Sequence, residues 1–195
     1  MNYKHTKCRA WGVESLESRL LMAAGALDKS FSSDGKTTID IGGGVIMDAS
    51  DVAVQSDGKT VIVGEARASA TSQTFKFVVA RLNLDGTPDT TFGTSGNGIV
   101  QADVGDGSDD SANCVAIQGD GKIVVGGFSE VGGLFGETVK FGVARFNTNG
   151  TLDKNFSGDG KRTIDFGFGF ARDILIQTVN TANGPVEKIL IVGED

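Results

Sequence analysis

Histidine, tyrosine and tryptophan are almost missing from this 195-residue sequence. Tyr3, His5 and Trp11 are the single members of their types, and all lie close to the N-terminus. The rest of the chain has phenylalanine as its only aromatic residue, and phenylalanine fills cores without offering a polar group. Because no histidine remains there, that part cannot contain a Ser-His-Asp triad, a histidine general base or a histidine-bound zinc ion.

Cysteine and proline are also scarce, with two residues of each. Cys8 and Cys114 do not make a disulfide framework, and Cys114 lies in an apolar run, where a buried free thiol is expected. Glycine, by contrast, is abundant. Its 29 residues are spread among β-branched runs, which predicts many tight turns between short strands.

The charge of the chain is unevenly distributed around a net value of −7. Residues 1–24 carry four basic and two acidic side chains, whereas the remainder is strongly acidic. An acidic body argues against binding to nucleic acid or to an anionic membrane surface. The apolar residues 20–24 are too few for a signal-peptide core or a transmembrane segment. We therefore expect residues 1–24 to form a disordered N-terminal arm.

One pattern, G-x-x-D-x-x-F-x-x-x-G, occurs three times and organises the rest of the chain. Its aspartate is Asp28, Asp89 and Asp153, so the pattern returns after 61 and then 64 residues. A near-constant period of this length is typical of a repeat architecture. The predicted units are 25–85, 86–149 and 150–195, the last of them truncated.

Each unit alternates short apolar runs with turn residues. Asp57-Gly58 and Asp120-Gly121 stand between β-branched runs, which is a strong signal for a β-hairpin. In the second unit the run after this turn is one residue shorter than in the first, and in the third unit the turn spans residues 178–187. The expected strands are 36–41, 51–55, 60–64 and 75–83, then 98–103, 114–118, 123–126 and 141–147, then 161–166, 173–177 and 188–194.

Two further signatures follow the first in order. They are V-A-[VI]-Q-x-D-G-K before a β-branched run, and A-R-[LF]-N-x-[DN]-G. Together the three resemble the delta-60 repeat, a β-propeller-like family of largely uncharacterised bacterial proteins, over residues 25–195. Pro88 and Ser95 depart from the pattern. The resemblance implies an all-β fold, an antiparallel repeat array forming a partial, open β-propeller with about four strands per repeat. The signature residues are Asp28, Phe31, Gly35, Asp89, Phe92, Gly96, Asp153, Phe156, Gly160, Asp57, Gly58, Asp120, Gly121, Arg81 and Arg145.

Residues 16–21, LESRLL, resemble the LEPR-XLL motif of large exported bacterial surface proteins, with Ser18 in place of proline. That motif stands ahead of repeat regions in such proteins, as it does here. The resemblance implies a secreted or cell-surface location in a bacterium.

The recurring polar residues have structural and functional interpretations. An aspartate just before a turn usually accepts hydrogen bonds from backbone amides two or three residues later, which we favour over a ligand role. The three phenylalanines are expected to plug the core between repeats. Arg81 and Arg145 are expected to bind a carboxylate or carbonyl of an adjacent turn rather than a substrate.

The loop over residues 103–110 is the one site-like cluster. Calcium takes oxygen ligands, and closely spaced aspartates on a glycine-rich loop supply several. The spacing differs from an EF-hand, so a solvated loop is the favoured interpretation and a calcium site the alternative. The candidate ligands are Asp103, Asp106, Asp109 and Asp110.

The sequence favours a non-enzymatic β-propeller module with a structural or interaction role, without a cofactor and without catalytic residues. The alternative is a ligand-binding or carbohydrate-active propeller, assisted by calcium, in which paired carboxylates act on glycosides. Expected partners are further repeats of the same type, a second copy of the chain, or other surface proteins. An array of so few units does not close, so uncovered apolar faces are expected at both of its ends.

Overall fold

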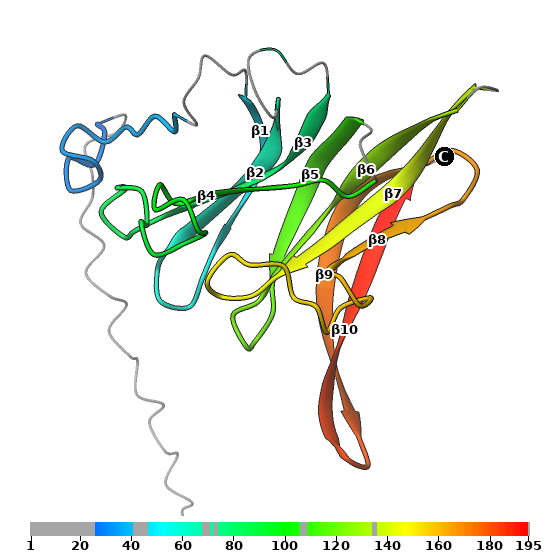
Figure 1. Ribbon diagram of the computed structural model, residues 1–195. Coiled ribbons are helices and arrows are strands. Elements are labelled where there is room, and N and C mark those ends of the chain that lie inside the picture. Colours follow the sequence, from blue (N-terminus) through cyan, green and yellow to red (C-terminus); the bar gives the residue numbers. More distant parts are fainter. Residues whose placement is uncertain are drawn as a thin grey trace, which may run out of the picture.

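The computed structural model describes residues 26–40, 47–67, 71, 74–105, 109–133 and 136–194. These residues form ten β-strands joined by turns, and they contain no helix. The strands make three antiparallel sheets that stand side by side, open rather than closed into a ring (Figure 1). The predicted all-β, open array of propeller-like sheets is confirmed. The predicted N-terminal arm lies outside the described residues.

The first two sheets have four strands each, in chain order from one edge to the other. In both sheets the first two strands are joined by the predicted hairpin, with Gly58 or Gly121 in the left-handed region at φ 84° and 81°. The first sheet contains β1 (Met47–Val54), β2 (Thr60–Arg67), β3 (Phe75–Leu82) and β4 (Ile99–Ala102), and the second contains β5 (Asp109–Ile117), β6 (Ile123–Gly133), β7 (Gly136–Phe146) and β8 (Lys161–Ile164).

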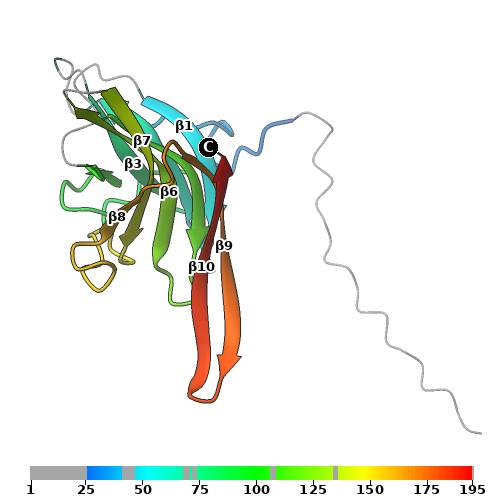
Figure 2. The same cartoon turned by 90° about the vertical axis from the view of Figure 1, so that its right-hand side faces the viewer.

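The third sheet is a two-stranded hairpin of β9 (Phe170–Thr181) and β10 (Gly184–Glu194). Figure 2 shows it as a long ribbon that extends past the ends of the other strands. The expected turn over residues 178–187 is wrong, because pairing continues until Thr181 faces Gly184. The turn itself is only Ala182-Asn183, and Gly184, at φ 106°, already pairs with Thr181, so the flanking residues stay in the strands.

The sheets are offset from the sequence repeats by one strand. β4 and β8 lie near the start of the second and third repeats, yet they pair with β3 and β7 of the sheet before them. They are therefore outermost strands of the preceding sheet. Residues 36–40, the corresponding stretch of the first repeat, do not form the strand that was expected there.

The strand after the hairpin turn in the second repeat, β6, is not shortened. Gly126 faces Cys114 on the neighbouring strand, as Val63 faces Asp51 in the first sheet. The expectation of a strand one residue shorter is therefore wrong. A Cβ atom at Gly126 would lie 2.7 Å from Ile174, so glycine there makes room for the third sheet.

The buried apolar residues lie in the interfaces between neighbouring sheets. Val61 and Val63 of β2 pack with Ile123 and Val125 of β6 in the first interface. Val124, between those two β6 residues, points the other way and packs with β9 in the second interface. A strand covered on both faces reads as a continuous apolar run, and the run in β6 shows this.

The first strand of each sheet lies along one side of the array. Within the described residues, the backbone amide of Val115 in β5 donates to Asp51 Oδ2 of β1 at 2.8 Å. On its other side, β5 is joined to β9 by the side chain of Asn113, whose Nδ2 donates to the carbonyl of Ala171 at 3.0 Å. β1, β5 and β9 are thus neighbours, as the innermost strands of propeller blades are.

Candidate functional site

The three sequence signatures meet at one buried carboxylate in the first repeat junction. Asp89 Oδ2 accepts hydrogen bonds from Lys59 Nζ and from Arg81 Nε, each at 2.8 Å. Its side chain is 3% exposed, and that of Arg81 is 7% exposed. Residues from three separate signatures therefore form one ion-pair cluster.

The second repeat contains the same cluster with a longer contact. Asp153 Oδ2 lies 2.9 Å from Arg145 Nε but 3.7 Å from Lys122 Nζ. Lys122 forms its closer ion pair with Asp120, at 2.7 Å. The lysine of this cluster is thus divided between two carboxylates.

The second oxygen of each signature aspartate caps the loop that follows it. Asp89 Oδ1 accepts from the backbone amide of Thr91 at 3.0 Å, and Asp153 Oδ1 from that of Asn155 at 3.0 Å. Asp28 Oδ1 accepts from Ser30 in the same way, at 2.9 Å. These are the turn contacts that the sequence predicts.

The cluster controls the ionisation of Asp89. Burial by itself would raise the pKa of this carboxyl, but hydrogen bonds from Lys59 and Thr91 and the positive charge of Arg81 oppose it. They hold the pKa of Asp89 well below its usual range. Asp89 is therefore a permanently charged anchor rather than a group that exchanges protons near neutral pH.

Arg81 also connects two repeats. Its Nη1 donates to the carbonyl of Thr148 at 2.5 Å, and its guanidinium lies 4.5 Å from the centre of the Phe92 ring. Arg145 lies over Phe156 at 5.0 Å in the equivalent place. The predicted contacts of these arginines with a carboxylate or a turn carbonyl are present.

The signature phenylalanines sit under glycines of the following repeat. Phe92 is fully buried in the first interface, and a Cβ atom at Gly150 would lie 3.0 Å from its ring. The next amide, that of Gly93, donates to the carbonyl of Asn149 at 2.8 Å. Phe31 lies under Gly86 in the same manner. Phe31 and Phe156, at the two ends of the array, are only half-buried.

The remaining signature residues shape turns. Asp57 and Asp120 accept hydrogen bonds from the amides of Lys59 and Lys122, each at 3.1 Å. The glycines that end the three signatures, Gly35, Gly96 and Gly160, lie in the loops that follow the signature phenylalanines. The amides of Gly35 and Gly160 donate to the carbonyls of Phe31 and Phe156 at 2.7 and 2.8 Å, and Gly96 lies in an exposed part of its loop.

The candidate calcium ligands are spread over several contacts. Asp103 pairs with Lys76 at 2.7 Å, and Asp109 Oδ1 accepts from the amide of Phe75 at 2.8 Å. Asp110 is fully buried, and its Oδ2 accepts from the amide of Val104 at 2.7 Å. Asp106 lies outside the described residues. Over the described ranges, no group of three or more acidic, cysteine or histidine side chains is arranged to hold a metal ion.

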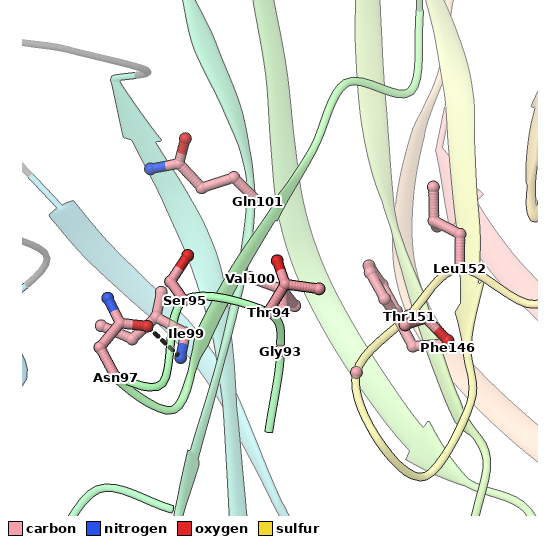
Figure 3. Close-up of a pocket in the computed structure, with 11 residues that line it drawn as sticks. Gly93, Thr94, Ser95, Asn97, Ile99, Val100, Gln101, Phe146, Thr151 and Leu152 are labelled. Carbon is pink, nitrogen blue, oxygen red and sulfur yellow. Dashed lines mark hydrogen bonds between the residues drawn. The ribbon is translucent and has the colours of Figure 1, made fainter. Parts of the chain in front are cut away.

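A groove between the first two sheets was not indicated by any motif. It has a volume of about 480 Å³ and runs between the loop before β4 and the turn after β7. Figure 3 shows Ser95, Asn97 and Gln101 on one wall and Thr151 and Leu152 on the other. The lining side chains are all uncharged. They are Thr94, Ser95, Asn97, Ile99, Val100, Gln101, Phe146, Thr151 and Leu152, with the backbone of Gly93 and Gly150.

The groove could not be found from the sequence. Its walls come from the end of one signature and the start of the next, and nothing in the pattern places these two segments side by side. One hydrogen bond fixes its polar wall, from the amide of Ile99 to Asn97 Oδ1 at 3.1 Å. Phe146 is 1% exposed, so its ring does not offer an open face to a ligand. The groove is suited to neutral polar groups and not to charged ones.

Comparison with known proteins agrees with this geometry. Residues 55–92 and 118–156 match the model of a β-propeller family described as a domain of unknown function, DUF5122. The first match runs from Gln55 to Phe92 and the second from Gln118 to Phe156, so each contains the three residues of one ion-pair cluster. Two segments of the chain are thus similar to a β-propeller domain, and the open antiparallel sheets agree with that likeness. A search of curated proteins found no match. Over the described residues, no helix is long and apolar enough to cross a membrane.

Proposed function

We propose that this chain is a non-enzymatic structural and interaction module of stacked β-propeller blades. The observation that carries the proposal is the ion-pair cluster at Asp89. Lys59, Arg81 and Asp89 satisfy one another, and Arg81 also binds the next repeat. The repeated ionisable residues therefore hold blades together and leave no charge free for chemistry at this place.

A location outside the cell is part of the proposal. It is supported by the resemblance of residues 16–21 to an export-associated motif. Fractionation of cells that express the full chain provides the test. Recovery in the surface or culture fraction supports export, whereas full retention in the cytoplasm contradicts it.

A second candidate function is binding of a neutral ligand such as a carbohydrate. The groove beside β4 favours it, because hydroxyl and amide side chains recognise neutral polar groups. The buried Phe146 weakens it, because sugar rings favour exposed aromatic platforms. Calcium assistance through the 103–110 loop stays a prediction of this second candidate.

One experiment separates the two candidates. The wild-type chain is tested against a panel of glycoside, ester and phosphoester substrates and on a glycan array, with and without calcium. The structural role predicts no turnover and no glycan signal. A glycan signal that is lost in a Gln101→Ala variant, and kept in a Lys36→Ala variant outside the groove, would instead establish the binding function. Turnover above a buffer control would overturn the non-enzymatic assignment.

A further inference from the structure

Over the described residues, the array presents two exposed apolar faces, one at each end. The back face is on β1, where the side chains of Val52 and Val54 are 58% and 67% exposed. The front face is on the terminal hairpin, where Leu175, Leu190 and Val192 are 64%, 41% and 60% exposed. Apolar groups gathered at this level of exposure mark interaction surfaces.

The back face repeats a surface that is covered inside the chain. Val52 and Val54 face Ile62 and Thr60 across the first hairpin, as Val115 and Ile117 face Val125 and Ile123 across the second. Val115 and Ile117 pack in the interface with the first sheet. The positions left open on β1 are therefore those that the preceding sheet covers on β5.

The front face repeats the complementary surface. Leu190 faces Leu175 in the third sheet, as Val124 faces Ala116 in the second. Val124 is fully buried and Ala116 packs beside it, both in the interface with the third sheet. The open residues of the hairpin thus occupy positions that the following sheet covers elsewhere in the chain.

We propose that a second copy of this chain docks head-to-tail, with the front face of one copy on the back face of the other. The proposal rests on the assigned role as an interaction module and names its partner. The contact continues a sheet-to-sheet interface that the chain already builds twice, from sheet one to two and from two to three. Because the two faces differ, the contact is heterologous, and it leads to a ring or to an open chain of copies.

An aspartate on the innermost strand of the terminal hairpin is also placed to hydrogen-bond to a second copy. Asp51 caps its own next amide, that of Val52, and its second oxygen accepts from Val115 of the following sheet. Asp173 occupies the same register position in β9 and caps Ile174 in the same way, at 2.8 Å. Asp173 is exposed, at the front edge where the inner strand of a second copy would lie.

Face-specific variants test the polarity of the contact. Val54→Lys places a charge in the back face, and Leu175→Lys places one in the front face. Both positions are exposed, so the core is unchanged, and circular dichroism checks the fold. Thr94→Lys adds the same charge in the groove, away from both faces, and is the control. Sedimentation velocity over the micromolar range measures association.

The wild type and the Thr94→Lys control are expected to associate, while each face variant alone is monomeric. An equal mixture of the two face variants is expected to form one-to-one dimers, because each keeps the face that the other has lost. A monomeric wild type, a face variant that associates alone as well as the wild type does, or a mixture that stays monomeric would each overturn the proposal.

A second pair of variants is used if the lysine variants do not fold. If either lysine variant loses its β spectrum, Val54→Cys and Leu175→Cys replace the two lysine variants in a Cys8→Ser background. A disulfide-linked dimer is then expected mainly from the mixture, and equal yields from either variant alone would contradict the contact. A monomeric wild type leaves the proposed function intact with another partner, whereas turnover in the substrate panel overturns that function without affecting the association result.

Discussion

Phe92 lies directly beneath Gly150, from which it is separated by 58 residues of chain, with no room for a side chain between them. A Cβ atom at Gly150 would stand 3.0 Å from the ring and 2.8 Å from the backbone nitrogen of Gly93. The same relationship joins Phe31 to Gly86 one repeat earlier. A phenylalanine of one repeat and a glycine of the next thus form the unit of contact between neighbouring blades.

Gly150→Ala is expected to destabilise the fold more than Gly158→Ala. Both glycines have left-handed backbone, at φ 85° and 93°, so alanine costs about 1–2 kcal/mol at either position. Gly158 has open space around it, whereas Gly150 meets the Phe92 ring, which adds about 1–3 kcal/mol. Urea unfolding measures the difference. Equal losses for the two variants would show that the loop can move away from the ring.

Phe92→Ala is expected to lower the free energy of unfolding by about 3–5 kcal/mol, because it empties a fully buried site between two sheets. Phe156→Ala is the matched variant in the third repeat, where the ring is half-buried. Its loss should be clearly smaller. Thermal or urea unfolding of both variants decides, and a larger loss for Phe156→Ala would contradict the plug role given to Phe92.

Asp89→Asn is expected to reduce stability at neutral pH by about 3 kcal/mol, because it leaves Arg81 and Lys59 without their carboxylate. The folded pKa of Asp89 is lowered, so its contribution is present above the ordinary carboxyl pKa, about 3.9, and is lost as pH falls below it. Stability curves of the wild type and the variant should therefore converge in acid.

Asp28→Asn is the control for this prediction. Asp28 makes the same turn contact with Ser30, but within the described residues no basic side chain pairs with it. The variant should differ little from the wild type at any pH. A loss at Asp28 as large as that at Asp89 would assign the effect to the turn and not to the ion pairs.

Cys114 is expected to be unreactive in the folded protein. Burial and the negative charges of Asp173 and Asp51 raise the pKa of its thiol to about 12, so the reactive thiolate is absent near neutral pH. In a Cys8→Ser background, a chromogenic disulfide reagent should label no thiol at pH 8 without denaturant and one thiol in urea. Rapid labelling of the native protein would show that the second sheet interface opens.

Local chemistry explains which parts of this fold the sequence predicted. Four correctly predicted features depend on residues close in the chain or on a repeated pattern. They are the turns at Asp57-Gly58 and Asp120-Gly121, the cap formed by Asp89 and the burial of Phe92. The pairing of β4 with β3 depends instead on which edge a strand reaches. A strand segment has the same sequence whether it begins one sheet or completes another, so the sequence does not show which strand it pairs with.

The groove and the ion-pair cluster also depend on contacts that the sequence does not predict. Each member of the cluster recurs in its own signature, but nothing in the signatures states that Lys59, Arg81 and Asp89 share one point in space. Gln101 and Thr151 meet across the groove because two sheets stack at a particular angle. Such contacts arise from the packing of whole sheets and have no local signal.

The offset of β4 has a mechanical consequence. This strand forms the edge of the first sheet, yet the loop that leads into it is bonded through Gly93 to Asn149, after the third strand of the second sheet. A pulling force on the N-terminal end of the array is therefore transmitted to the second sheet before all strands of the first sheet have separated. Neighbouring sheets should unfold together in a single force peak instead of one after another.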